Sequence, residues 1–320
     1  MISQIKKWLF AHTKLGNERY LKYLYAYDEK RFLVYSALHK ESQEAIATEM
    51  RILVHTVEKA FSLPETQVGF GREKILHLIE LLEKYQTADN PKDTQVIDYS
   101  YSIIQEYIKW QTAHGGDISF LPAKYLVCDS MICTGVIECC HNNADIHSFS
   151  DAAYARHSLR YYGTEKVSPE QYRQAVALAQ TAPSACNRQS SRVYVCMDAD
   201  KMRQIIQMHG GMRGFGEASA IVVLTGDLSL YTSEYERNTV FVDGGIFLMN
   251  LLYAFQEYDI AACPIIWGAI PENDNALYEL LGIPQSEEII SLIVSGSFPE
   301  GEYKVAKSAK RSTDSILTIV

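Results

Sequence analysis

Basic and hydroxyl side chains gather in a short segment of an otherwise acidic chain. Arg156, His157, Ser158 and Arg160 lie within five residues of one another. Arginine forks match phosphate oxygens bidentately, and a serine hydroxyl can bond phosphate or sugar oxygens. Residues 156–162, here called the arginine segment, therefore predict a site for a phosphorylated ligand. An exposed, solvated turn is the alternative for the two arginines taken alone.

A second polar cluster, the 182–191 turn, offers a different chemistry. It contains Pro183, Ser184, Asn187 and Gln189. Its backbone donors, hydroxyl and carboxamide suit the edge of a flat heterocycle. The turn is thus expected to bind a ring rather than a phosphate.

A helix must separate the two clusters and set their spacing. Ser168 is a predicted N-cap, Pro169 occupies the first helical position, and Gln171 completes a capping box. Pro183 stops the run. A helix of about 14 residues spans roughly 20 Å, so the two clusters can reach different parts of one long ligand.

Together these residues resemble the FMN-dependent nitroreductase family. Its first signature, Arg-(Arg/His)-Ser-x-(Arg/Lys)-x-(Phe/Tyr), is matched at every position of the arginine segment. Its second, Ala-Pro-Ser-x-x-Asn-x-Gln-Pro-Trp, is matched through Gln189, after which Ser190 and Ser191 replace Pro-Trp. The resemblance implies that FMN phosphate, ribityl chain and pyrimidine edge are bound by Arg156, His157, Ser158, Arg160, Pro183, Ser184, Asn187 and Gln189.

Residues 259–268 resemble the family's Gly-Leu-Gly-x-x-(Pro)-Ile loop, whose backbone runs along the redox edge of the flavin. Asp259 and Ala261 stand where the family has glycines. The resemblance implies that the flavin face is formed by Pro264, Ile265, Ile266 and Trp267. Cys263 is interpreted as a packed thiol, because no base is placed beside it by sequence.

The resemblance also implies an α+β fold, with a mixed sheet flanked by helices, and a homodimer with FMN at the subunit interface. Strands are predicted at residues 192–197, 219–225 and 288–295. A small sheet with a free edge needs a partner, and the last residues, Ile-Leu-Thr-Ile-Val, have a strand pattern. This arm is expected to cross to the other subunit and bring Lys310 and Arg311 to the flavin phosphate.

Residues 1–148 are predicted to form an all-helical domain that precedes a flavin domain at 149–320. The tyrosine-rich stretch at residues 20–38 is interpreted as part of an amphipathic bundle. A helix at residues 40–61 carries His55, Glu58 and Lys59. This segment resembles a helical extension of nitroreductase-like proteins associated with surface-polysaccharide gene sets. The alternative for His55 and Glu58 is a surface pair one helical turn apart.

The composition limits the possible partners and compartment. A net charge of −9 and a pI near 5.5 argue against a nucleic-acid or anionic-membrane surface. The apolar run at residues 246–255 is too short to cross a bilayer, no targeting segment is convincing, and a soluble, cytoplasmic protein is predicted. The seven cysteines fit a reducing compartment. No metal site is expected, because zinc-type spacing is missing among Cys128, Cys133, Cys139, Cys140 and His141.

The sequence contains no catalytic triad, paired carboxylates or metal motif, so no side chain is predicted to be catalytic. A cofactor can carry hydride chemistry that the protein only orients. The chain is therefore interpreted as an FMN-dependent oxidoreductase. It would take electrons from NADH or NADPH and pass them to a small-molecule acceptor in a ping-pong cycle. The alternative is a helical interaction scaffold in surface-polysaccharide biosynthesis with a degenerate flavin domain, suggested by the departures at Ser190, Ser191 and Ala261.

Overall fold

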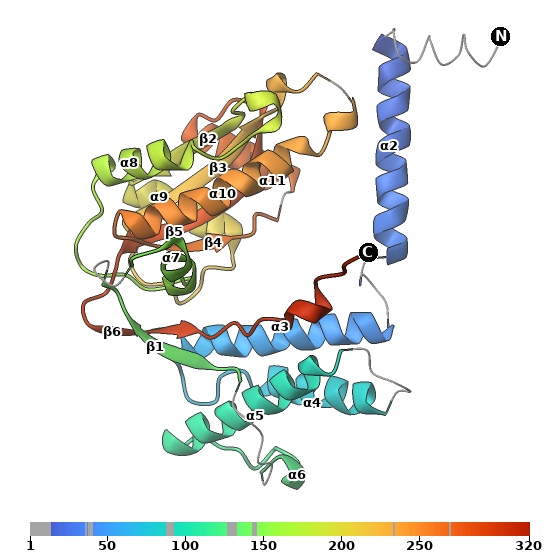
Figure 1. The fold of residues 1–320 in the computed structure, drawn as a ribbon. Helices are drawn as coiled ribbons and strands as arrows, with labels where there is room; N and C mark the ends of the chain where they lie inside the picture. Colours follow the sequence, from blue (N-terminus) through green and yellow to red (C-terminus); the bar gives the residue numbers. More distant parts are fainter. Residues whose placement is uncertain are drawn as a thin grey trace, which may run out of the picture.

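The computed structural model describes residues 14–35, 37, 41–87, 93–126, 133–142, 146–232, 234–268 and 270–320. A helical bundle forms one part of the molecule, and a sheet covered by helices on both faces forms the other (Figure 1). The predicted α+β class is confirmed. The boundary at residue 148 stays a prediction.

The bundle is built from three amphipathic helices. They are α3 (Gln43–Phe61), α4 (Arg72–Gln86) and α5 (Gln95–Ala113), followed by the short α6 (Ala123–Leu126). Ser42 caps α3 by accepting the Ala45 N–H at 3.2 Å. The core between the helices is aliphatic and aromatic, with its largest fully buried side chains at Met50, Ile75, Leu78, Leu82, Tyr85, Ile103, Ile104, Tyr107 and Tyr125.

The tyrosine-rich helix α2 (Lys14–Tyr35) stands apart from this bundle (Figure 1). Tyr23 and Tyr25 are exposed, and Tyr20 packs edge-on against Tyr235 at 5.8 Å. The interpretation of residues 20–38 as part of the bundle is therefore wrong for α2. Its apolar residues surround the helix instead of forming one stripe, so it has no single face to bury.

The main sheet has four antiparallel strands in the order β2-β3-β5-β4. They are β2 (Ser191–Cys196), β3 (Ala220–Asp227), β5 (Glu287–Ser297) and β4 (Ile260–Ile265). The three predicted strands correspond to β2, β3 and β5. Residues 220–224 of β3 are fully buried, as a continuous apolar run between two covered faces requires.

Helices cover both faces of this sheet. One core lies under α8 (Pro169–Ala179) and α10 (Thr239–Glu257). The other lies under α9 (Ala199–His209) and α11 (Pro271–Leu281). The predicted capping box of α8 is confirmed, with Ser168 and Gln171 bonded reciprocally. The remaining elements of the described residues are α7 (Phe149–Ala155) and short 3-10 helices at Ala185–Asn187, Leu228–Leu230, Glu234–Glu236 and Thr313–Ser315.

A two-stranded ribbon joins the two parts of the molecule. In it β1 (Val136–Cys140) pairs antiparallel with β6 (Glu302–Ala306). The expectation that residues 1–148 are helical throughout is therefore wrong at β1. Its partner, β6, follows the whole sheet domain in the sequence. The residues around β1 contain no local pattern that indicates this pairing.

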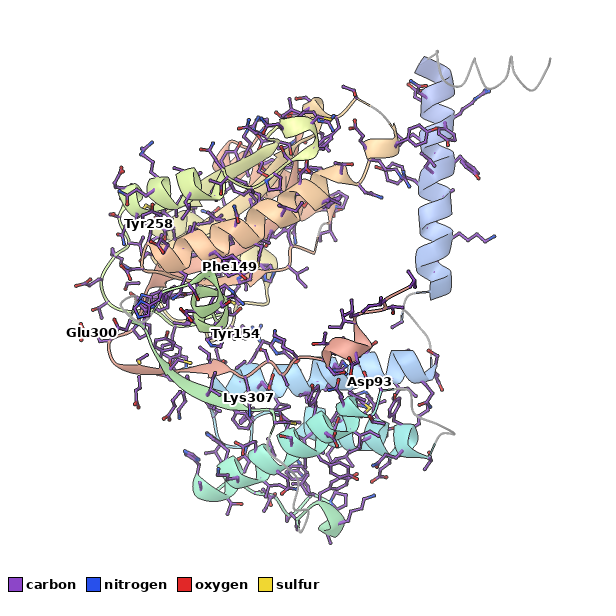
Figure 2. The ribbon with its side chains drawn as sticks, viewed as in Figure 1. Asp93, Phe149, Tyr154, Tyr258, Glu300 and Lys307 are labelled. Carbon is purple, nitrogen blue, oxygen red and sulfur yellow. The ribbon has the colours of Figure 1, made fainter. Side chains whose placement is uncertain are left out.

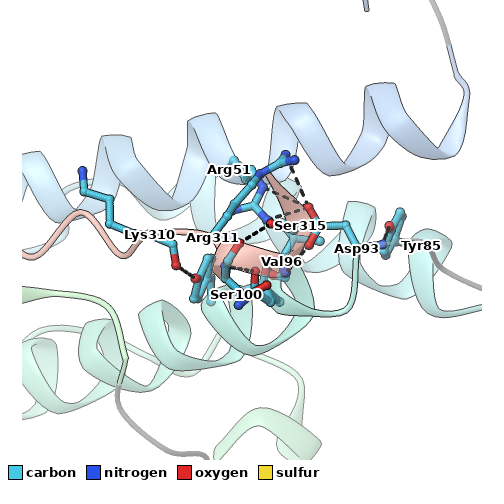
Figure 3. Close-up of polar contacts among 11 residues, drawn as sticks. Arg51, Tyr85, Asp93, Val96, Ser100, Lys310, Arg311 and Ser315 are labelled. Carbon is cyan, nitrogen blue, oxygen red and sulfur yellow. Dashed lines mark hydrogen bonds and ion pairs between the residues drawn. The ribbon is translucent and has the colours of Figure 1, made fainter. Parts of the chain in front are cut away.

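After β6 the chain runs along the helical bundle (Figure 3). The Tyr99 hydroxyl donates to the Lys310 carbonyl at 2.8 Å, and the Ser312 N–H donates to Gln95 Oε1 at 3.2 Å. Residues 316–320 are exposed and contain no strand in this single chain. The expected terminal strand is thus not formed here, because no neighbouring strand in the described residues forms backbone hydrogen bonds with it.

Among the described residues, α10 is the one helix long and apolar enough to cross a membrane, and half of its apolar stretch is buried. It packs against α8, β3 and β4. A core helix satisfies the same length and composition criteria.

Alkaline pH should destabilise the sheet domain. Burial raises the pKa of Tyr172 and of Tyr278 to about 12, whereas an unfolded tyrosine titrates near 10. The folded state holds these protons more tightly, so their contribution is complete below about pH 10 and is lost as pH rises towards about 12. Urea unfolding midpoints followed by circular dichroism should fall across this window. The fall should be smaller in Tyr172→Phe, and an equal fall would contradict the role of Tyr172.

Candidate functional site

The arginine segment is held along the free edge of β4. Ser158 forms a parallel bridge with Ala262, and the Leu159 N–H donates to the Ala262 carbonyl at 3.1 Å. Leu159 is buried in a small core with Ala261 and β6. Because neighbouring side chains of an extended segment point to opposite sides, Ser158 and Arg160 lie on the side away from this core.

Arg160 is buried without a counter-charge. Its side chain is 7% exposed, and Nη1 donates to the Ser158 carbonyl at 3.3 Å. Arg156 is half-buried, and burial lowers its pKa. Within the described parts of the chain, no carboxylate forms an ion pair with either guanidinium. Buried charges are normally paired, so an anion bound at the arginine segment would supply the missing partner.

The Cys263 thiol lies against the same side chains. It is buried, and its pKa is raised by that burial. The Ser158 hydroxyl and the positive charges of Arg160, Lys59 and Arg156 act in the opposite direction. The net effect keeps the thiol protonated, which fits the interpretation of Cys263 as a packed residue rather than a nucleophile.

The two basic residues near the C-terminus have different surroundings. Burial lowers the His157 pKa, and the charges of Arg156 and Lys310 lower it further, so Lys310 lies near the arginine segment. Arg311 instead faces the bundle, where its guanidinium pairs with Asp93 at 3.5 Å beside Arg51 (Figure 3). The structure therefore brings Lys310, rather than Arg311, towards the predicted phosphate site.

The 182–191 turn has a strained backbone. Cys186, Asn187 and Gln189 have φ angles of 50°, 55° and 52°, which place three residues other than glycine in the left-handed region. The Ser184 hydroxyl accepts the Gln189 N–H at 2.9 Å and fixes the curve. Such strain persists where the surroundings impose it, commonly at ligand sites.

A buried network ties this turn to α10. Asp243 accepts the Ala185 N–H at 3.1 Å and the Tyr231 hydroxyl at 2.9 Å, and Tyr231 in turn bonds the Ser190 hydroxyl at 2.7 Å. The replacement of the family's proline by Ser190 is therefore structurally accommodated. Asp243 and Tyr231 were not predicted from the sequence. The signal in the sequence that could have identified Asp243 is its position as an acidic residue inside an apolar helix.

A cleft of about 780 Å³ opens beside the turn. Its lining comes from the turn, α8, β2 and α10, and includes Pro183, Ser184, Gln189, Tyr172 and Phe247. Apolar walls with a few polar groups are typical of ligand pockets. Three predicted ring-binding residues thus line one cavity.

The arginine segment and the turn lie at different positions along α10. Arg156 is close to Tyr253, whose ring also packs against Phe149 of α7 at 5.0 Å, whereas the turn is bonded to Asp243. Phe149 is labelled in Figure 2. Ten helical residues correspond to about 15 Å. The two clusters therefore suit the two ends of one extended ligand, or halves of sites that a second copy completes.

The residues predicted to form the flavin face, 264–267, lie at the end of a strand and just after it rather than in a loop. Residues 260–265 form β4, and Ile266 is 87% exposed. The Trp267 side chain is buried in the second core, where Nε1 donates to Asp274 at 2.5 Å. Asp259 has φ 56°, which explains the usual glycine at this position, and aspartate tolerates that conformation. The backbone contact between β4 and the arginine segment is made at Ala262, two residues before Pro264.

The described residues contain no group of three metal-ligating side chains. His141 bonds Asp259 at 2.7 Å and Gln256 at 3.2 Å, so it links the end of β1 to the start of β4. Cys139 and Cys140 lie in β1, and Cys128 is outside the described residues.

Comparison with known proteins supports the sequence resemblance. The family model described as "Nitroreductase family" matches residues 153–211. A protein of Archaeoglobus fulgidus assigned as an NADH dehydrogenase/NAD(P)H nitroreductase is 30% identical over 152 residues, covering 47% of this chain and 84% of that protein. The FMN reductase [NAD(P)H] of Bacillus subtilis is 27% identical over 154 residues, covering 43% and 61%.

A solved structure, the nitroreductase family protein of Streptococcus pneumoniae, superposes with a TM-score of 0.48 at 18% identity, covering 54% of this chain and 100% of that one. The match to the Archaeoglobus protein over most of its length shows that the chain belongs to the nitroreductase family.

Proposed function

We propose that this protein is an FMN-dependent oxidoreductase that takes a hydride from NADH or NADPH and reduces a small-molecule acceptor. The observation that carries the proposal is Arg160, a buried guanidinium without a carboxylate among the described residues, beside Arg156 on the family's FMN signature. The similarity to a relative named FMN reductase [NAD(P)H] supports both the cofactor and the donor.

The residues of the arginine segment fit the charged part of FMN. Arg156 and Lys310 would bind its phosphate, with His157 and Ser158 beside them. Arg160 would donate to the pyrimidine edge, where a fixed positive charge favours added negative charge. When bound, FMN supplies the hydride-accepting and hydride-donating atom.

The 182–191 turn would bind the ring of the cofactor. Pro183 and Ser184 line the adjacent cleft, and the strained backbone presents Asn187 and Gln189. Backbone of Pro264, Ile265 and Ile266 would complete the ring site. Donor and acceptor would then bind in turn over the same exposed ring face, which gives the proposed ping-pong order.

A homodimer would place these clusters together. The outer face of α10 exposes four large apolar side chains between them, at Phe241, Val242, Ile246 and Met249. A contiguous apolar patch of this kind marks an interaction surface. A second copy covering this face would bring the arginine segment of one chain towards the turn of the other, with FMN between them.

The colour of the purified protein tests the proposal. It should be yellow, or become so with added FMN, and its visible flavin absorption should bleach when NADH or NADPH is added without oxygen. A protein that stays colourless after reconstitution would contradict it. That result would favour the alternative, a scaffold with an N-terminal helical domain at residues 1–148 that acts in surface-polysaccharide biosynthesis.

Removing residues 312–320 should weaken dimerisation and FMN retention together. These residues include the exposed apolar stretch at 316–320, and their removal also deletes the Ser312–Gln95 bond next to Lys310. Light scattering and bound-flavin absorbance measure both effects. A truncated protein that remains dimeric and yellow would show that this arm has neither role.

A further inference from the structure

The β1–β6 ribbon lies against the arginine segment. Leu159 is 2% exposed and packs in one small core with Tyr303 and Val305 of β6. The Tyr161 hydroxyl accepts the Lys304 N–H at 2.6 Å. Alternate N–H groups of a two-stranded ribbon point away from the partner strand, so this hydroxyl caps the free edge of β6. The backbone of the same segment is bonded to β4, and the segment is therefore held by two separate strands.

At its bundle end the ribbon is fixed by a buried carboxylate. Glu58 of α3 is 2% exposed and accepts the Gly135 N–H at 3.0 Å, just before β1. The Lys307 N–H donates to the Gly135 carbonyl at 2.9 Å, just after β6. The expected surface pair of His55 and Glu58 is wrong in this respect, because the carboxylate is buried. The two strands are thus tied to each other and to the last turn of α3.

His141, directly after β1, joins the other end of the ribbon to the sheet domain. With its proton on Nε2 it donates to the Asp259 carboxylate at 2.7 Å, and its Nδ1 accepts from the Gln256 amide at 3.2 Å. Its ring stacks on Phe298, with centroids 3.6 Å apart. Asp259 immediately precedes β4, the strand that pairs with the arginine segment. His141 therefore fixes the ribbon and β4 relative to each other.

The position of the Arg160 guanidinium depends on these contacts. It donates to the Ser158 carbonyl at 3.3 Å, and no carboxylate of the described residues pairs with it. Leu159 and Tyr161 flank Arg160, and both are held by the ribbon. Because neighbouring side chains of an extended segment point to opposite sides, movement of either neighbour displaces the guanidinium as well. A displacement of about 1 Å is enough to weaken a cofactor contact.

We propose that the β1–β6 ribbon is a positioning element of the cofactor site, which directs Arg160 to the flavin ring through Leu159 and Tyr161. This inference rests on the proposed FMN function. It gives the helical bundle a role in cofactor binding, because the ribbon is anchored to α3 at one end and to β4 at the other.

Tyr161→Phe tests the contact between the ribbon and the segment. FMN and riboflavin, which differ by the phosphate, should both bind about twofold to tenfold more weakly, because Arg160 contacts the ring. The midpoint potential of the bound flavin should become more negative, because a displaced Arg160 favours negative charge on the ring less. The matched control is Tyr278→Phe, which removes a hydroxyl that donates to the Glu287 carbonyl at 2.7 Å. It should keep the wild-type affinity and potential.

His141→Ala tests the ribbon from a side chain that bonds Asp259 and Gln256 rather than the arginine segment. It should show the same two effects as Tyr161→Phe. His141→Gln should restore most of the affinity and the potential, because a glutamine amide can donate to Asp259 as Nε2 does. Circular dichroism melting checks that each variant is folded.

Three results would overturn the assignment. Wild-type affinity and potential in both Tyr161→Phe and His141→Ala would show that the ribbon does not position Arg160. Weaker FMN binding with unchanged riboflavin binding would place the effect at the phosphate. Equal losses in Tyr278→Phe would indicate a general loss of stability.

Failure of the FMN function gives a different signature. If the wild-type protein binds no flavin, the proposed function fails, and amide hydrogen exchange of the protein alone still tests the ribbon. Exchange in residues 156–162, which include the Leu159 N–H bonded to Ala262, should be faster in Tyr161→Phe than in the wild type and unchanged in Tyr278→Phe. Equal exchange in all three proteins would overturn the positioning role.

Discussion

Arg156→Ala should lose about tenfold to more than a hundredfold in FMN affinity while keeping its fold. A charge-assisted hydrogen bond contributes about 1.5–3 kcal/mol, and each 1.4 kcal/mol is about tenfold. In the described structure the Arg156 guanidinium has no protein hydrogen-bond partner. Its removal therefore leaves no buried acceptor without a hydrogen bond. Fluorescence titration of FMN into the apoprotein measures the loss.

Arg203→Ala is the matched control, because that guanidinium is exposed on α9 and pairs with Asp200. It should bind FMN normally. Arg311→Ala should add little to the Arg156 effect, since Arg311 is engaged with Asp93. Wild-type affinity in Arg156→Ala would exclude the arginine segment from the cofactor site.

Ile246→Glu should convert the proposed dimer into a monomer and lower flavin retention with it. Ile246 lies in the middle of the exposed apolar face of α10, and a two-fold interface would bury the new carboxylate twice. Loss of a central interface side chain costs about 2 kcal/mol or more, so two copies would weaken association about a thousandfold. Sedimentation or light scattering at micromolar protein would detect the monomer.

The comparison variant is Ile206→Glu, on the opposite side of the sheet, with a side-chain exposure of 37% against 41% for Ile246. It should remain dimeric. Dimers in both variants would place the subunit interface elsewhere, and monomers in both would indicate a general loss of structure.

Local signals predicted the elements whose stability is local. The Ser168–Gln171 capping box and the buried run of β3 are each encoded within a few residues. β4 was expected to be a loop because of the family's glycines, yet pairing with β5 on one edge and Ser158 on the other makes it a strand. Its partners are distant in sequence, so the pattern of residues 259–268 alone could not reveal them.

The site was predictable to the same extent. The arginine segment and the turn were found because their residue types are unusual at that spacing, and Pro183, Ser184 and Gln189 do line one cleft. Asp243 was not assigned to the site, because its proximity to the turn depends on how α10 packs. Trp267 was expected at the flavin face. Its side chain is instead buried in the second core and donates a hydrogen bond to Asp274.

The β1–β6 ribbon has a consequence for how the protein is made. Between these two strands the ribosome must synthesise the entire sheet domain, so a nascent chain carries β1 with no strand to pair with until β6 emerges. Long-range pairing of this kind forms late, and an unpaired strand edge is a site of aggregation. Chains interrupted before residue 302 would therefore lack the pairing partner of β1 and leave its hydrogen-bonding edge open.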